Sequence, residues 1–297
     1  MIDKLDFLIA LAREKHFGRA AEACGVTQPT LSAGIRALEE QLGAVLVNRG
    51  SRFIGFTPEG ERVLEWARRI VGDARAMRQE VNALRHGLAG HLRIAAVPTA
   101  LGLMTALTTP YRTRHPHVRI SVQSRPSADI LDLLENLEID AGLTYVDNEP
   151  VGRARTIPLY RERYRFLTAA RNGPMAERES VSWADFAGVP LCLLTPDMQN
   201  RRIVDRLLRG AGLKSDPQLE SNSIVVLISH VRTGHWCTIL PERLAETVGL
   251  EGEIRAIPIL GAPVTPTIGL VVPHREPMAP LTAALVSEAR RLADEED

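Results

Sequence analysis

The chain has 297 residues, of which 45% are hydrophobic and 24% charged, and its 36 Lys and Arg residues balance its 36 Asp and Glu residues. This composition is typical of a globular protein of about two domains and excludes disordered and collagen-like chains. Three scattered cysteines are too few for a disulfide framework or a zinc site. No apolar run is long enough to span a membrane, and the N-terminal residues lack the pattern of a signal peptide. We therefore expect a cytoplasmic protein with no metal, no cofactor and no membrane contact.

A helix-turn-helix is predicted near the N-terminus. Gly25 fits a left-handed turn position, Thr27 can cap the following helix, and Pro29 fits the first turn of that helix. The inner face of this second helix is apolar and consists of Leu31, Ile35, Leu38 and Leu42. Such a module places its second helix in the major groove of double-stranded DNA. The residues expected to face the groove are Thr27, Gln28, Pro29, Thr30, Ser32, Ala33 and Arg36.

A wing is predicted to follow, which completes a DNA-binding domain over residues 1–58. Two apolar runs, 45–47 and 53–54, flank a turn at residues 50–51. Arg49 and Arg52 stand beside this turn, where their charges can meet phosphate or the minor groove. Residues 1–90 carry 13 Lys and Arg against 11 Asp and Glu, a net charge of only +2. One copy should therefore bind DNA weakly, and pairing of two copies would offset this.

Residues 59–90 are predicted to form a linker helix of about 30 residues, beginning after Thr57 and Pro58 and ending at a hinge near Gly87 and Gly90. Its apolar residues recur at spacings of four and three: Val63, Ala67, Ile70, Ala74, Met77, Val81, Leu84 and Leu88. A seam of this kind favours pairing with the same helix of a second copy. The alternative is a helix that packs on its own domain.

From residue 91 the pattern changes to short apolar runs that alternate with amphipathic stretches, which predicts an α/β fold with largely parallel sheets. Strands are expected at 92–97, 118–122, 141–145, 165–168, 189–194, 236–240 and 268–272. Helices are expected at 101–114, 128–137, 201–211 and 224–233. The sequence has no phosphate-binding loop, no dinucleotide fingerprint and no convincing catalytic set, so an enzyme is not expected.

The order of the N-terminal motifs resembles that of LysR-type transcriptional regulators. The matching residues are Ala20-Ala21, Val26-Thr27-Gln28-Pro29, Leu31-Ser32, Ile35, Leu38-Glu39, Leu42-Gly43, Leu46, Arg49 and Thr57-Pro58-Glu59-Gly60. The chain departs from the family pattern at Cys24, Gly34 and Val47, and Gly34 removes one usual DNA contact from the second helix. The resemblance implies that residues 91–297 form an effector domain like a periplasmic binding protein. Its two α/β subdomains would comprise 91–160 with 267–297, and 161–266.

The same resemblance implies that a small-molecule effector binds between these subdomains. The candidate contacts are Pro98, Thr99, Ala100, Ser127, Thr144, Thr195, Met198 and Trp236. Loops that open helices offer N–H groups to anions, so a small anion or carboxylate is the preferred effector. A similarity over residues 234–238 to family members that control formate or cyanate metabolism suggests a formate-like molecule.

These features together predict a cytoplasmic, nucleoid-associated regulator in which the effector changes the arrangement of paired DNA-binding modules. The resemblance further implies a homodimer through the linker helix, a homotetramer, and RNA polymerase as a candidate transient partner. Three alternatives remain open: a solute-binding protein with a helical appendage, an enzyme with a regulatory N-terminal domain, and an architectural DNA-binding protein. The missing signal peptide, the missing catalytic set and the large α/β region argue against them in turn.

Overall fold

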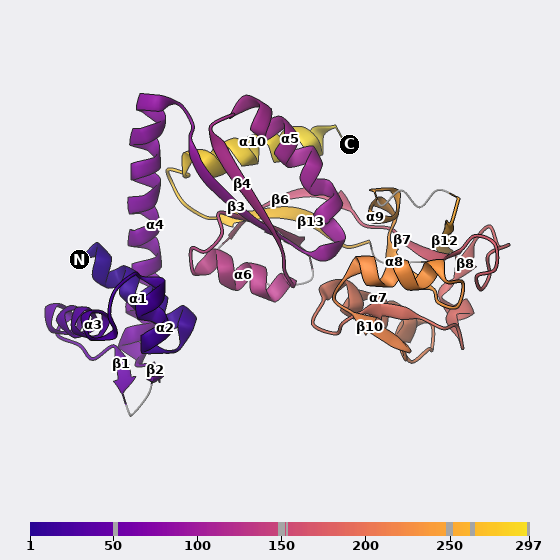
Figure 1. Ribbon diagram of the computed structural model, residues 1–297, viewed down its shortest axis with the longest axis horizontal. Helices are drawn as coiled ribbons and strands as arrows, with labels where there is room; N and C mark the ends of the chain where they lie inside the picture. The colour runs from indigo at the N-terminus through magenta and orange to yellow at the C-terminus, as the bar shows by residue number, and fades with distance from the viewer. Residues whose placement is uncertain (50–52, 148–151, 153, 248–251, 262–264, 296–297) are drawn as a thin grey trace. The chain divides into compact units, whose positions relative to one another are not determined.

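The computed structural model describes residues 1–49, 53–147, 152, 154–247, 252–261 and 265–295 (Figure 1). Contacts between segments divide the chain into two compact units. The first unit contains residues 1–89 together with the short segments 135–138 and 275–281. The second unit contains residues 90–134, 139–274 and 282–297. The DNA-binding module and the long helix predicted from the sequence thus fall in the first unit.

The first unit is a winged helix-turn-helix followed by a long helix. Its elements are α1 (Ile2–Glu14), α2 (Phe17–Ala23), α3 (Gln28–Leu42), β1 (Val47–Arg49), β2 (Phe53–Phe56) and α4 (Pro58–His86). The core draws on α1, α2, α3 and α4 through Leu8, Ile9, Ala20, Leu31, Ile35, Leu64 and Val71. Strands β1 and β2 pair antiparallel as the predicted wing, whose turn at residues 50–51 lies outside the described residues.

Local signals in the sequence explain where these helices begin and end. Gly25 has a φ of 67°, as the predicted turn requires, and Thr27 caps α3 by accepting a hydrogen bond from the Thr30 N–H at 3.4 Å. Gly43 ends α3 in the left-handed conformation. The expectation for Leu42 was wrong: its side chain is 46% exposed, because it occupies the last turn of α3 beyond the packed part of the helix.

The helix α4 confirms the prediction of a long helix after Pro58 but divides its apolar residues between two faces. One face is buried within the first unit and includes Leu64, Ala67, Val71 and Ala76. The other face is exposed and carries Trp66, Ile70, Met77, Val81 and Leu84. The predicted seam was therefore wrong at its start, since Ala67 packs into the core of its own unit and Trp66 lies on the exposed face. From Ile70 to Leu84 the exposed seam follows the predicted positions.

The second unit contains two sheets joined by crossover strands. The first sheet has the order β4-β3-β5-β13-β6. Its strands are β3 (Gly90–Ala96), β4 (Val118–Ser124), β5 (Ala141–Tyr145), β6 (Ala154–Arg161) and β13 (Thr267–Pro273). The helices associated with it are η1 (Pro98–Leu103), α5 (Met104–Arg114), α6 (Ser127–Glu135) and α10 (Pro280–Asp294). Figure 1 shows α5 and α10 on one side of this sheet and α6 on the other.

The second sheet has the order β11-β7-β12-β8, and a separate two-stranded pair joins β10 to β9. Its strands are β7 (Tyr164–Ala169), β8 (Val181–Ser182), β11 (Thr238–Pro241) and β12 (Ile254–Leu260), and the pair comprises β9 (Cys192–Leu194) and β10 (Leu219–Ser221). The surrounding helices are η2 (Trp183–Phe186), α7 (Gln199–Gly210), α8 (Ile224–Arg232) and α9 (Glu242–Thr247).

The expectation of largely parallel sheets holds only in part. Strands β3, β4 and β5 are parallel, as helical connections require, but β13 runs antiparallel to both β5 and β6. In the second sheet β7 is antiparallel to β11 and to β12. The reason is the crossover: β6 leads the chain out of the first sheet and β13 brings it back, so both strands join that sheet without a helical connection.

Neither a membrane-spanning helix nor a metal-binding group of side chains is found in the part of the chain that the structure describes. None of its helices combines the length and apolarity needed to cross a membrane. None of its groups of His, Cys, Asp and Glu side chains is arranged to hold a metal ion.

Candidate functional site

The predicted groove-facing residues form an exposed surface at the N-terminal half of α3, which we call the reading face. Gln28, Pro29, Thr30, Ala33 and Arg36 are exposed and Ser32 is half-buried, while the apolar residues on the opposite face of α3 are buried. Polar side chains that are not engaged in the core are available for base edges and phosphates. The arrangement is therefore suited to docking in a DNA groove.

Gly34 lies at a packing contact rather than on the exposed surface of α3. A Cβ atom at this position would lie 2.6 Å from the ring of Phe7 in α1. A larger side chain at position 34 would therefore require the Phe7 ring to move. Of the two wing arginines, Arg49 belongs to β1, and Arg52 lies outside the described residues.

A group of buried polar side chains lies where the chain crosses between the two sheets of the second unit. We call Thr99, Tyr145, Glu162, Tyr164 and Asn200 the hinge cluster. Glu162 stands between β6 and β7, and its N–H donates to the carbonyl of Pro266 on the returning strand, at 2.8 Å. All five side chains of the cluster are buried, and they come from both subdomains.

The hinge cluster is organised around the Glu162 carboxyl, which is 1% exposed. Its Oε2 accepts hydrogen bonds from the hydroxyls of Tyr145 at 2.8 Å and Tyr164 at 3.3 Å. Thr99 Oγ1 lies 3.2 Å from the Tyr145 hydroxyl and completes the chain of hydrogen bonds. Two polar atoms of the cluster, Glu162 Oε1 and Asn200 Nδ2, have no hydrogen-bond partner among the described residues. Buried polar groups are normally paired, so these two atoms indicate a place for a water molecule or a ligand.

Burial dominates the electrostatics of the cluster. It raises the pKa of the Glu162 carboxyl to about 7, while the hydrogen bonds from Tyr145 and Tyr164 act in the opposite direction. The pKa values of Tyr145 and Tyr164 are raised further still, first by burial and then by the charge of Glu162. Glu162 can therefore gain or lose a proton near neutral pH, whereas both tyrosines stay neutral there.

A cationic group lies at the edge of the same region. Arg202, in the first turns of α7, places Nη2 3.5 Å from Ser127 Oγ, at the start of α6. Ser127 and Thr99 follow the parallel strands β4 and β3, whose ends are in register at Ser124 and Ala96. The carboxyl ends of neighbouring parallel strands share one edge of the sheet, so the two hydroxyl groups lie on the same side of the unit.

Some of the predicted effector contacts come together at this junction. Thr99 belongs to the hinge cluster, with Pro98 and Ala100 buried beside it in η1, and Ser127 contacts Arg202. Thr144 is buried but points to the opposite face of β5 from Tyr145, because side chains alternate along a strand. Thr195 has a buried hydroxyl with no hydrogen-bond partner among the described residues.

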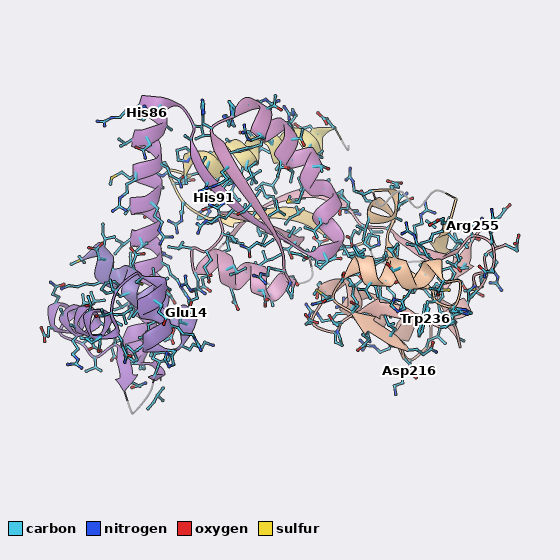
Figure 2. All side chains as sticks on the ribbon, in the orientation of Figure 1. Glu14, His86, His91, Asp216, Trp236 and Arg255 are labelled. Carbon is cyan, nitrogen blue, oxygen red and sulfur yellow. The ribbon has the colours of Figure 1, made fainter. Side chains whose placement is uncertain are left out.

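Two other predicted contacts, Met198 and Trp236, pack in or against an apolar core. Met198 is 5% exposed and packs in the apolar core beneath α8. Trp236 packs partly against the same core, with its ring edge-to-face with His230 at 5.9 Å. Figure 2 shows Trp236 in the part of the second unit that contains α7 and α8. The segment 234–238, which suggested a formate-like effector, leads into β11 and contributes mainly to packing.

The cysteines do not form a reactive pair. Burial raises the pKa of Cys192 to about 12 and that of Cys237 to about 11, and it also raises the pKa of Cys24. Leu191 and Cys237 are partners in a parallel bridge, so the side chains of Cys192 and Cys237 point to opposite faces. The Cys192 thiol approaches the carbonyl of Leu227, and the Cys237 thiol approaches Thr168.

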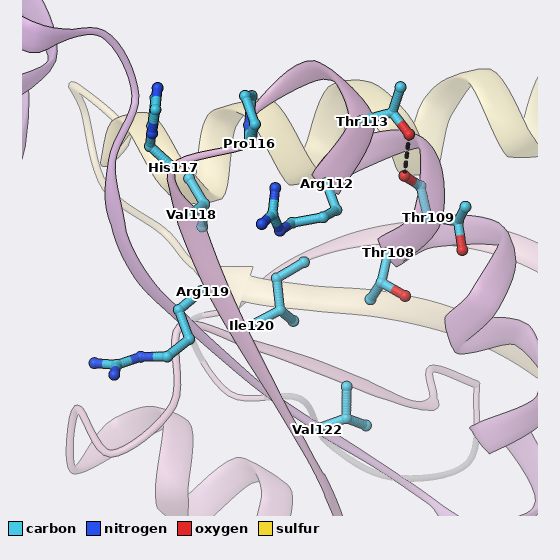
Figure 3. Close-up of a pocket in the computed structure, with 10 residues that line it drawn as sticks. All are labelled: Thr108, Thr109, Arg112, Thr113, Pro116, His117, Val118, Arg119, Ile120 and Val122. Carbon is cyan, nitrogen blue, oxygen red and sulfur yellow. Dashed lines mark hydrogen bonds between the residues drawn. The ribbon is translucent and has the colours of Figure 1, made fainter.

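A groove of about 750 Å³ lies on the outer edge of the first sheet, between α5 and β4. Figure 3 shows Arg112 extending from α5 towards β4, near Val118 and Ile120. Thr109, Thr113, His117 and Arg119 also line it. None of the predicted effector contacts lines this groove, so it is a feature separate from the hinge cluster.

Sequence reasoning missed Glu162, Tyr164 and Arg202. Glu162 lies within the run Arg161-Glu162-Arg163, which looks like a solvent-exposed turn. Arg202 follows another arginine at the start of an amphipathic helix and looks like an ordinary surface residue. The one available signal was the pattern Tyr-Arg-Glu-Arg-Tyr at 160–164, an acid flanked by aromatic residues between two apolar runs.

Comparison with known proteins gives a consistent result over the whole chain. Residues 2–61 match the family model of the bacterial regulatory helix-turn-helix proteins of the lysR family, and residues 85–294 match that of the LysR substrate binding domain. A hydrogen peroxide-inducible genes activator of Pectobacterium carotovorum is 30% identical over 241 residues, covering 81% of this chain and 79% of the relative. The DNA-binding transcriptional dual regulator OxyR of Escherichia coli K12 is 28% identical, covering 93% and 90%.

Solved structures show the same similarity. Full-length OxyR from Pseudomonas aeruginosa, solved as a variant with one cysteine replaced by aspartate, has a TM-score of 0.76 and 26% identity, covering 99% of this chain and 96% of that one. CbnR in complex with its target DNA has a TM-score of 0.61 and 22% identity, covering 99% and 100%, and so shows a shared fold.

Proposed function

The chain belongs to the LysR family of bacterial transcriptional regulators, and on that premise we propose that a small organic acid, bound beside the hinge cluster, controls how a homodimer of this protein engages promoter DNA. Members of this family are non-enzymatic regulators that bind double-stranded DNA through the helix-turn-helix and bind effectors through the substrate domain. The proposal concerns the effector, its site and the dimer.

The observation that carries the proposal is the junction of Ser127, Arg202 and the hinge cluster. Arg202 supplies a positive charge, α6 supplies the N–H groups of its first turn, and Asn200 Nδ2 supplies a further donor. Together these groups suit a carboxylate. They lie on both sides of the crossover at Glu162, so a ligand there would change how the two subdomains pack, and that change would be passed to the DNA-binding modules.

The formate-like effector expected from residues 234–238 is not retained. That segment contributes to packing, and the Pectobacterium carotovorum relative is named for hydrogen peroxide rather than for a small anion. We retain Thr99, Ser127 and Thr195 as candidate contacts and add Arg202, Asn200 and Glu162. For DNA we retain residues 27–36 of the helix-turn-helix and the wing arginines, within the proposed division into 1–58, 59–90 and 91–297.

Sensing of peroxide by cysteine oxidation is the second candidate, because relatives named as hydrogen peroxide-inducible genes activators align over most of the chain. The thiolate is the nucleophile in such chemistry, and burial keeps the thiols of Cys192 and Cys237 protonated. Their opposite orientation also prevents a disulfide between them without rearrangement of the strands. We therefore favour reversible binding of an effector over oxidation.

Pairing through α4 is supported by the exposed seam of Trp66, Ile70, Met77, Val81 and Leu84. From Ile70 to Leu84 the spacing of these residues matches that of a two-stranded coiled coil, with Trp66 outside the register, and a second copy provides the complementary seam. The net charge of +2 over residues 1–90 gives one copy little non-specific affinity, which pairing would offset. A tetramer and contact with RNA polymerase remain extensions of this proposal.

The test begins with sequencing of the genomic fragments that the purified protein retains. Binding to the strongest fragment is then titrated with and without small organic acids, amines, neutral metabolites and hydrogen peroxide. We expect an organic acid to change the affinity or the footprint, and a Cys192→Ala/Cys237→Ala variant to respond equally. A response to peroxide alone, lost in that variant, would establish the thiol mechanism instead. The Leu84→Asp variant should be a monomer in sedimentation analysis and should bind the same fragment more weakly.

A further inference from the structure

The hinge cluster contains a buried acid with no positive charge beside it. The groups that face Glu162 are Thr99 from η1, Tyr145 from β5, Tyr164 from β7 and Asn200 from α7, together with the backbone of Pro266. All of these groups are uncharged near neutral pH. An ionised Glu162 therefore lacks a compensating charge among the described residues that contact it, which is costly for a buried group.

The geometry of the carboxyl shows which partner it lacks. Oε2 already accepts two hydrogen bonds from tyrosine hydroxyls, whereas Oε1 accepts none from the described residues. A ligand ammonium group would donate to Oε1 and neutralise the charge at the same time. The hydroxyl oxygens of Thr99 and Tyr145 offer further acceptors next to this position.

The helix α7 contributes candidate donors for a carboxylate group. Asn200 stands beside the Tyr164 hydroxyl, and its Nδ2 has no acceptor among the described residues. Arg202, two residues further along α7, is held by Gln199 Oε1 at 2.6 Å and by the Asp197 carbonyl at 2.8 Å, and its Nη2 makes only a long contact of 3.5 Å with Ser127 Oγ. Asn200 and Arg202 on α7 and Ser127 at the start of α6 are therefore the candidate donors for a carboxylate.

We infer that the effector is a small amino acid, whose ammonium group binds Glu162 Oε1 and whose carboxylate binds Asn200, Arg202 and Ser127. This inference rests on the proposed function and specifies its ligand. It requires two opposite charges on one molecule, which an organic acid without an amine cannot provide. It also makes Glu162 a specificity-determining residue that selects amino acids over the corresponding simple acids.

The inference predicts a particular pH dependence. Because burial raises the pKa of Glu162 to about 7, the carboxyl is mostly protonated at pH 5.5 and must lose its proton to bind an ammonium group. Affinity for the amino acid should therefore rise as pH increases from 5.5 to about 7, by up to about tenfold per unit, and then level off. A ligand that accepts a hydrogen bond from the protonated acid would show the opposite trend.

The experiment uses the full-length protein and isothermal titration calorimetry with each of the twenty standard amino acids. The tightest binder is compared with the matching carboxylic acid without the amine and the matching amine without the carboxylate. We expect the amino acid to bind at least tenfold tighter than either. Glu162→Gln should remove most of that preference and flatten the pH profile, with affinity for the simple acid unchanged. Glu177→Gln, a matched change at an exposed acid, should behave as wild type.

Several outcomes would overturn the inference. One is that none of the twenty amino acids binds, and another is that the simple acid or the amine binds as well as the amino acid. A third is that Glu162→Gln leaves the preference intact. If Glu162→Gln does not fold, the matched ligands and the pH profile of the wild-type protein still decide the question. If a different molecule from the earlier screen changes DNA binding, the proposed function stands and only the amino-acid inference fails.

Discussion

The reading face of α3 and the hinge cluster are built in opposite ways. The candidate DNA contacts of α3 lie within ten consecutive positions, 27–36, and are mostly exposed. The hinge cluster draws on residues from 99 to 200, all buried, and its hydrogen bonds connect η1, β5, β7 and the crossover. An exposed set can change its ligand contacts without affecting the core, whereas a buried set links ligand binding to stability.

The largest expected effect concerns Glu162→Gln, which should stabilise the protein at high pH. Between about pH 4.5 and 7 the folded protein retains a proton on Glu162 that the unfolded chain has released. The free energy of unfolding therefore falls as pH rises through this range, and above pH 7 the loss stays constant. Replacement by an uncharged isostere removes the penalty, a gain of about 3 kcal/mol above pH 7 and none near pH 4. Urea unfolding of both proteins from pH 4.5 to 8.5 measures this difference in the free energy of unfolding.

The control for this measurement is Glu177→Gln, which should follow the wild-type curve at every pH because this side chain is exposed. If the Glu162→Gln and wild-type curves run parallel across the range, the carboxyl is compensated in the folded state, and the contrast between the buried cluster and the exposed helix is lost.

The next effect concerns Arg36→Ala on the reading face. Loss of one arginine contact to a base or phosphate should weaken DNA binding by about 1–3 kcal/mol, at least tenfold in dissociation constant. Stability should not change, because the side chain is exposed. Fluorescence anisotropy with the retained genomic fragment gives the affinity, and thermal unfolding gives the stability. Arg209→Ala, the same change on an exposed part of α7, should leave DNA affinity unaltered; equal losses in both variants would remove Arg36 from the interface.

The smallest effect compares two threonine caps that look alike in the sequence. Thr57 accepts a hydrogen bond from Gly60 at 2.9 Å and donates to the carbonyl of Val45 at 2.6 Å. Thr27 accepts a longer hydrogen bond from the Thr30 N–H, at 3.4 Å, and its second contact, 2.9 Å from the Thr30 hydroxyl, joins two exposed side chains of the same turn rather than two segments. Thr57→Ala should therefore cost about 1–2 kcal/mol and Thr27→Ala about 0.5 kcal/mol. Urea unfolding followed by circular dichroism separates them, and equal costs would show that the extra contact of Thr57 contributes nothing.

The N-terminal unit was predictable because its signals are local. The turn at Gly25, the caps at Thr27 and Thr57 and the apolar spacing of α3 each depend on neighbouring residues, and each is found in the structure. The errors arose where tertiary packing decides. Ala67 belongs to the core of its own unit although its spacing fits the seam, and Leu42 is exposed although its spacing fits the buried face.

The effector region was predictable only in outline. The positions of β3, β4, β5 and α6 followed from the alternation of apolar runs, and Thr99 and Ser127 followed from their places after strands. The strands β6 and β12 were missed, since both alternate polar and apolar residues that also fit an exposed loop. The subdomain bounds put the crossings near residues 160 and 266, but no local pattern showed that Glu162 is buried there against Tyr145 and Tyr164.

The sequence by itself determined the family, the reading helix and the long helix after it, because these depend on the order and spacing of nearby residues. It also determined that the chain holds three cysteines, but not that two of them point to opposite faces of paired strands and are kept protonated by burial. The tertiary structure alone decided which acid is buried, which polar atoms lack partners and which helix face remains exposed. Burial and charge compensation depend on residues far apart in the chain, and a local pattern carries no information about them.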